Sequence, residues 1–146
     1  MKKNIINRDF FKEVTGIEVN TAYISEIHEN EICFGAKHIH NNGDIEFFDG
    51  VMDTARFATL VKKWANRYGY SIVSGNLGVD YTDGEYQILP YWYAVAYHID
   101  DTVDKNPDSE EGYYRYKVKS DDEAKAIIEV GMKIWKEINK QKGKNE

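Results

Sequence analysis

The sequence has few residues that restrict the chain by disulfide bonds or by a fixed backbone angle, with one cysteine and two prolines among 146 residues. A lone cysteine, Cys33, cannot form a disulfide bond within the chain, which favours a reducing compartment. No stretch approaches the roughly 18 uninterrupted apolar residues of a membrane-spanning helix. Segment 1–7 begins like a signal peptide but lacks the apolar region that such a peptide needs. We therefore expect a cytoplasmic protein without a membrane contact.

The sequence also lacks a catalytic or metal-binding motif. His38 and His40 form an H-x-H pair, but a catalytic zinc site needs a third ligand. Segment Asp104–Asp108 starts like a calcium loop, yet Ser109 and Arg115 stand where that motif requires Gly and Glu. We expect no metal, no cofactor and no catalytic residue, and we favour a protein that is not an enzyme.

The charge is acidic overall and unevenly placed. The formal net charge is −6, with six acids and one lysine between Asp100 and Glu111. From Lys133 to the end, five lysines face two glutamates. Because nucleic-acid affinity comes largely from Lys and Arg on phosphates, this balance argues against a nucleic-acid partner. The acidic segment is either a solvated loop or an electrostatic docking element for a basic partner.

Aromatic residues make up 14% of the chain, and eleven of them are tyrosines. In the expected strand Tyr86–Ile99, the two-residue period puts Tyr91, Tyr93 and Tyr97 on one face. The opposite face carries Trp92, Ala94, Ala96 and His98, a surface on which a helix can pack. The tyrosine row is either ordinary cross-strand packing or an interface, in whose cores tyrosine is enriched.

The first half of the chain predicts one short helix and three strands. A helix over Asp9–Val14 ends at Gly16, and the strand-like runs are 23–27, 32–39 and 45–48. Asn42-Gly43 predicts a hairpin with a type I′ turn, because both turn residues tolerate a positive φ.

Two longer helices and three further strands follow. The first helix runs from about Asp53 to Tyr68 and stops at Gly69. Strands are expected over 70–74, 86–99 and 113–118, with Pro90 marking a bend in the second. Ser120 and Glu123 form a capping box that opens the last helix, which ends after Asn139 in a polar, mobile tail from about residue 140.

These elements predict an α+β fold in one domain over residues 1–146, in the order α-βββα-βββα. Hairpin-length connections favour a mainly antiparallel sheet of about five to six strands. Two principal amphipathic helices are expected to pack on one face of it. The other face is then open to solvent or to a partner.

The second half resembles the small ABA-sandwich domains of phage and prophage accessory proteins. The similarity lies in the helix–strand joint Trp64–Tyr70 and in the acidic start of the closing helix, Ser120–Ala124. It implies a mobile-element setting more than a mechanism. The same element order is similar to double-stranded-RNA-binding domains, but acids stand here where those domains have a basic helix start.

Our leading hypothesis is a non-enzymatic protein-binding accessory protein, such as an inhibitor of a host defence or regulatory protein. Three tyrosines would anchor the contact and six acids would steer a basic partner: Tyr91, Tyr93, Tyr97, Asp100, Asp101, Asp104, Asp108, Glu110 and Glu111. Two alternatives stay open. One is a small-molecule-binding or enzymatic domain with a tyrosine-lined pocket on the open sheet face, and the other is a homodimer that buries the tyrosines.

Overall fold

A computed structural model describes residues 4–76, 78–88, 90–101 and 114–144 of the chain. The predicted α+β class and the antiparallel pairing of the strands are confirmed. The chain divides into two compact units, Met1–Leu60 and Val61–Glu146. Their boundary lies inside helix α2 (Thr54–Arg67).

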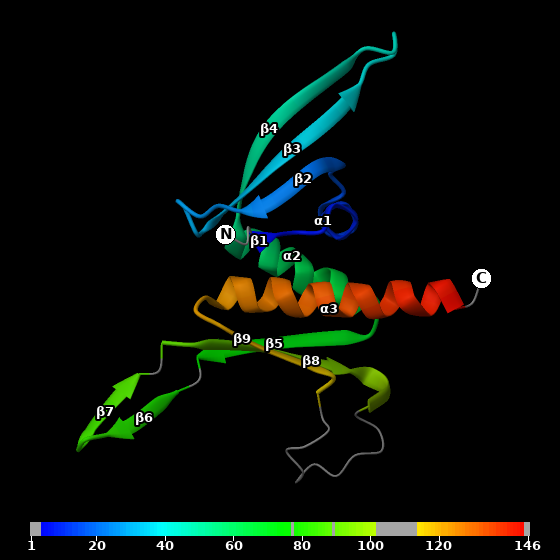
Figure 1. Cartoon of the computed structure of the whole chain (residues 1–146). Helices are drawn as coiled ribbons and strands as arrows, with labels where there is room; N and C mark the ends of the chain where they lie inside the picture. The colour runs from blue at the N-terminus through cyan, green and yellow to red at the C-terminus, as the bar shows by residue number, and fades with distance from the viewer. Residues whose placement is uncertain (1–3, 77, 89, 102–113, 145–146) are drawn as a thin grey trace. The chain divides into compact units, whose positions relative to one another are not determined.

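The first unit contains a four-stranded antiparallel sheet in the order β1-β2-β3-β4 (Figure 1). Its elements are β1 (Asn4–Ile5), α1 (Arg8–Thr15), β2 (Val19–Ile24), β3 (Glu31–Ile39) and β4 (Ile45–Asp53). The α1 helix begins where the Asn7 side chain accepts hydrogen bonds from the Asp9 and Phe10 amides. It ends at Gly16 in the left-handed conformation, as the sequence predicts.

Aromatic rings form the core of this unit. Phe10 and Phe11 of α1 are fully buried, and the Phe11 ring stacks on Phe57 with centroids 5.2 Å apart. Phe34 of β3 lies 5.3 Å from Phe11 and covers Gly50 on β4, where any Cβ would overlap the ring. A glycine opposite a large ring therefore lets the hairpin and α1 share one core.

The predicted hairpin at Asn42-Gly43 is confirmed, because β3 and β4 pair from Glu31↔Asp53 to Ile39↔Ile45. The predicted type I′ geometry is wrong. Of the two turn residues, only Gly43 has a positive φ (92°), and its amide donates to the His40 carbonyl. The geometry is that of a longer hairpin loop closed by a glycine bulge, which needs a single left-handed residue.

The second unit contains a three-stranded antiparallel sheet in the order β5-β8-β9. Its strands are β5 (Tyr70–Asn76), β8 (Trp92–His98) and β9 (Tyr116–Ser120). Helix α3 (Glu123–Lys144) packs along one face of this sheet and contacts all three strands (Figure 1). Ala94 and Ala96 of β8 are fully buried on the face where the sequence predicts helix packing.

The strands of the described residues are distributed over three sheets, so the prediction of one sheet of five to six strands is wrong. The third sheet is a ribbon of β6 (Val79–Thr82) and β7 (Glu85–Ile88). Asp83 and Gly84 join its strands, and both have a positive φ, which is the type I′ geometry expected elsewhere. The expected strand 86–99 is therefore two strands, separated near Pro90, which has no amide to donate to a ladder.

The start of α3 also differs from the prediction. Its N-cap is Asp122 and not Ser120, because the Asp122 carboxylate accepts the Lys125 amide at 3.0 Å. β9 extends through Ser120, so the first free cap position comes two residues later. The helix then continues to Lys144, beyond the predicted end at Asn139.

Asp122→Ala should lower the free energy of unfolding by about 1 kcal/mol, because a helix N-cap contributes roughly that amount. Ser120→Ala is the matched control and should cost clearly less. Urea denaturation followed by circular dichroism measures both variants. An equal loss in the two variants would return the cap to Ser120.

Candidate functional site

The face of the β5-β8-β9 sheet opposite α3 carries the residues that the sequence singles out. Alternation along the strands puts Tyr93 and Tyr97 of β8 on this face, and both are half-buried. Their neighbours on the face are Ser71, Val73 and Gly75 of β5 and Lys117 and Lys119 of β9. We call this set the tyrosine face.

Close approach to small residues holds one tyrosine against the sheet. Gly75 lies directly opposite Tyr93, and a Cβ built there would be 3.1 Å from the Tyr93 hydroxyl. Val95, between the two tyrosines in β8, is buried. The Tyr93 ring therefore lies over the neighbouring strand β5 at Gly75.

Lysines lie beside the aromatic rings. The Lys119 ammonium lies 4.1 Å from the ring centroid of Tyr91, which precedes β8 and is 42% exposed. Lys117 lies 6.0 Å from the Tyr114 ring. Ammonium groups over aromatic faces are attracted by the ring quadrupole. The tyrosine face is thus locally basic in an acidic protein, and the sequence prediction missed this. The signal was the alternation of lysine with Tyr116 and Val118.

Of the six predicted steering acids, the structure describes Asp100 and Asp101, in the 3₁₀ turn η1 (Ile99–Asp101). Asp104, Asp108, Glu110 and Glu111 lie outside the described residues. The Asp100 side chain is 80% exposed and lies 3.6 Å from the His98 ring. Asp101 is committed to an internal contact and has a structural role.

That contact is a bidentate ion pair between Asp101 and Arg115. Arg115 donates to Asp101 from Nε at 2.5 Å and from Nη2 at 3.1 Å, and Nη1 donates to the Tyr70 hydroxyl at 3.0 Å. The hydrogen bond to Asp101 raises the pKa of Arg115 above its ordinary value. A guanidinium in a planar two-point contact fixes geometry as well as charge. The pair thereby joins the chain on both sides of segment 102–113.

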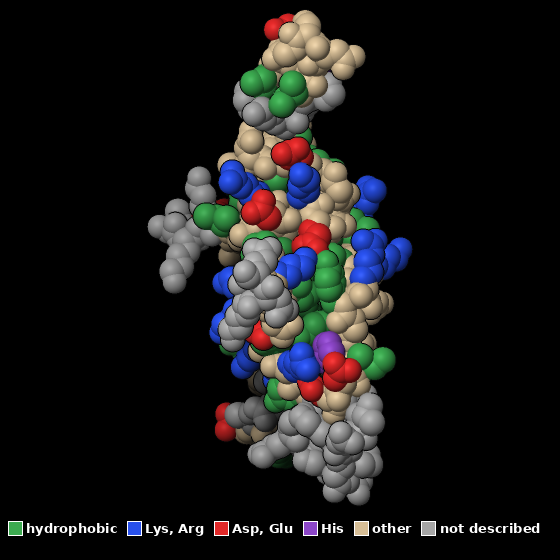
Figure 2. All heavy atoms as spheres, turned by 90° about the vertical axis from the view of Figure 1, so that its right-hand side faces the viewer, with side chains coloured by type: hydrophobic (Ala, Val, Ile, Leu, Met, Phe, Trp, Pro, Cys, Tyr) green, Lys and Arg blue, Asp and Glu red, His purple; other side chains and the backbone are tan. Residues whose placement is uncertain are grey.

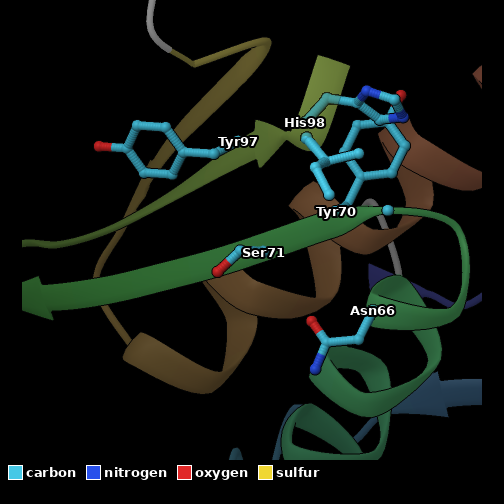
Figure 3. A pocket seen from close by; sticks show the side chains of 7 residues that line it. Asn66, Tyr70, Ser71, Tyr97 and His98 are labelled. Atoms are coloured by element: carbon cyan, nitrogen blue, oxygen red, sulfur yellow. The ribbon is translucent and has the colours of Figure 1, made fainter. Parts of the chain in front are cut away.

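A shallow pocket of about 340 Å³ lies near this end of the sheet. Figure 3 shows the Tyr70 and His98 rings side by side, while Tyr97 is directed away from them. The two rings meet edge to face with centroids 4.5 Å apart. His98 Nδ1 accepts the Asp100 amide at 3.1 Å, so in the neutral ring the proton belongs on Nε2. Asn66 and Ser71 add polar groups to the rim.

The pKa of the neighbouring Tyr116 is raised as well. Burial raises the pKa of Tyr116 on β9, because it disfavours the phenolate, and the Glu137 carboxylate on α3 adds to the effect. A raised pKa keeps Tyr116 protonated at neutral pH.

The H-x-H pair of the sequence, His38 and His40, lies at the end of β3 and in the loop that follows it. His40 Nε2 lies 2.7 Å from a Glu46 carboxylate oxygen across the hairpin, and the His38 side chain is outside the described set. Among described residues, no group of three or more His, Cys, Asp or Glu side chains could hold a metal ion. Cys33 is half-buried on β3, paired with Tyr23 and Val51.

Charges on the surface are mixed in sign. On the side shown in Figure 2, acidic and basic side chains interleave with apolar ones, and no large area carries one sign. Local sets of residues, such as the lysines of the tyrosine face, therefore matter more for recognition than the net charge does.

Arg115→Met should lower the free energy of unfolding by about 1–3 kcal/mol, because it leaves Asp101 and the Tyr70 hydroxyl without their charged donor. Lys117→Met removes an exposed cation two residues further along the chain and should change stability by less than about 0.5 kcal/mol. Urea denaturation compares the two. Equal stability of Arg115→Met and the parent chain would contradict a structural role for the pair.

Comparison with known proteins gives no match: no protein-family model, curated protein or solved structure corresponds to the chain. Within its described part, no helix has the length and apolar character needed to cross a membrane.

Proposed function

We propose that the chain is a non-enzymatic protein-binding protein whose contact surface is the tyrosine face. One observation carries the proposal: Tyr93 and Tyr97 are half-exposed on the sheet face that α3 leaves open, with Tyr91 exposed beside them. Tyrosine combines a large apolar ring with a polar tip and loses little entropy on binding. It is therefore enriched where protein interfaces gain most of their affinity.

The charges around the face constrain the partner. Carboxylates on a partner would complement Lys117 and Lys119, whereas a basic group on the partner would complement Asp100. The proposed steering of a basic partner surface therefore depends on Asp100 and, as a prediction, on the acids of segment 102–113. A partner with both signs in the matching places would be selected over one with a uniform charge.

The setting proposed from the sequence resemblance is a phage or mobile element. In that setting, the partner would be a host defence or regulatory protein, and binding alone would be enough to inhibit it. A contact surface suits such a role, because blocking a partner's surface requires only affinity.

Replacing either Tyr93 or Tyr97 with alanine should weaken partner binding at least about tenfold, which corresponds to roughly 1.4 kcal/mol. The partner is first captured from a bacterial lysate with the tagged chain and identified by mass spectrometry. Calorimetry with the purified partner then measures the affinities.

Tyr23→Ala is the matched control, since Tyr23 is a partly exposed tyrosine on β2 of the first unit. It should leave affinity unchanged. Circular dichroism confirms that each variant is folded. If the double variant of Tyr93 and Tyr97 bound the partner as the parent chain does, the tyrosine face would not be the contact surface.

The pocket beside Tyr70 and His98 supports a second candidate, a small-molecule-binding domain. Its volume of about 340 Å³ lies at the lower end of the range for ligand pockets. The Tyr70 ring, the His98 imidazole and the Asn66 amide are among the groups that line it and suit a flat polar ligand.

A thermal-shift screen against nucleotides and small aromatic acids tests this candidate. A true ligand at 100 times its Kd should stabilise the chain by about 2.7 kcal/mol. Ser71→Trp, which fills the rim of the pocket, should abolish the shift. A shift that survives in Ser71→Trp, or no shift from any compound, would remove the pocket from consideration.

A further inference from the structure

The two-stranded ribbon β6–β7 is built separately from the tyrosine face. Its strands are hydrogen-bonded to each other and belong to neither larger sheet. The Asp83-Gly84 turn fixes the register, because both residues adopt the left-handed conformation that matches the twist of the strands. The ribbon is thus a small element with a defined shape.

One side of the ribbon is apolar and exposed. Val79 pairs with Ile88, and two residues further along Tyr81 pairs with Tyr86, so all four side chains share a face. They are 60%, 76%, 61% and 79% exposed, respectively. The two tyrosine rings lie 4.9 Å apart and form a continuous aromatic surface.

Exposure of such an apolar surface to water is unfavourable in free energy. An isolated two-stranded hairpin is at best marginally stable, and a cluster of exposed large apolar side chains marks a binding site or an aggregation liability. The opposite side carries Glu85 and Gln87 next to a polar turn, so only one side of the ribbon is suited to burial.

The charge of the ribbon identifies what can cover its apolar side. From Gly78 to Pro90 the sequence has three acids, Asp80, Asp83 and Glu85, and no lysine or arginine. A nucleic-acid groove would be repelled, because it is lined with phosphates. A second copy of the ribbon has the same acids and offers no basic residue to complement them. A protein groove rimmed by lysine or arginine is complementary.

We infer that the β6–β7 ribbon is a docking element, which lays its apolar side in an apolar groove of a partner protein rimmed by basic residues. The turn presents the four side chains already arranged, which lowers the entropy lost on binding. The inference extends the proposed function, because it places a contact on an element outside the tyrosine face. It stands even if that face does not bind.

Site-directed photocrosslinking with the full chain tests the inference. The crosslinking amino acid p-benzoylphenylalanine replaces Tyr86 on the apolar side or, as the matched control, Gln87 on the polar side. Irradiation in the bacterial cells used for the capture experiment should label one partner protein from position 86 and leave position 87 unlabelled. Labelling of another copy of this chain, equal labelling from both positions or no labelling from position 86 would overturn the inference.

Affinity measurements with the crosslinked partner, once purified, complete the test. Tyr81→Ser combined with Tyr86→Ser should weaken binding at least about a hundredfold, if each side chain contributes a tenfold effect. Asp83→Asn combined with Glu85→Gln keeps the shape and should slow association at low salt, with the difference vanishing at high salt. Unchanged affinity in the double tyrosine variant, or a charge variant that matches the parent at low salt, would also overturn it.

The two proposed surfaces can fail separately. All four exposed ribbon side chains lie outside the core, so their variants should retain the parent's circular dichroism and stability. Loss of binding in Tyr93→Ala and Tyr97→Ala with full binding in the ribbon variants would support the tyrosine face and reject the ribbon. The reverse result would reject the tyrosine face and support the ribbon.

Discussion

The packing of α3 on β8 is the constraint on which the second unit depends. Ala94 and Ala96 are small enough for the helix to lie close to the strand, and both are fully buried. Because side chains in a strand alternate between two faces, this choice forces Tyr93, Val95 and Tyr97 to the other side. A larger residue at position 94 or 96 would push α3 away from the strand and disturb the sheet. The same alternation of side chains therefore determines both the helix-packing face and the tyrosine face.

The sequence could predict those features that depend on a few neighbouring residues. The two-residue period of β8 and the left-handed stops at Gly16 and Gly69 are local signals, and the structure confirms them. The sequence left Asp53 and Thr54 as possible caps of α2, and the Ala55 amide donates to the Asp53 carboxylate. Local signals failed where two residues compete for one role. Ser120 and Asp122 are both good caps, and the length of β9 decides between them. Likewise, Asn42-Gly43 and Asp83-Gly84 both suit a type I′ turn, but only the latter has two left-handed residues.

The site was predictable only in its local part. The face shared by Tyr93 and Tyr97 follows from strand alternation, whereas the contact of Arg115 with Asp101 and Tyr70 joins residues far apart in sequence and depends on the order β5-β8-β9. The prediction gave Asp101 a steering role, and its pairing with Arg115 could not be read from spacing. The prediction did not include Lys117 and Lys119, because the net charge of the chain does not show where basic side chains gather on one strand.

The opposite charges of the two surfaces limit how copies of this chain can associate. A symmetric dimer through the tyrosine face would place Lys117 and Lys119 of one copy near those of the other, and a symmetric dimer through the ribbon would join two elements that carry acids and no basic residue. The complementary arrangement pairs the face of one copy with the ribbon of another, and such a contact generates a closed ring or an open chain and not a simple dimer. Like-charge contacts across a symmetry axis cost free energy, whereas a foreign partner can supply opposite charges at both places. The charge pattern therefore disfavours symmetric self-association through either surface.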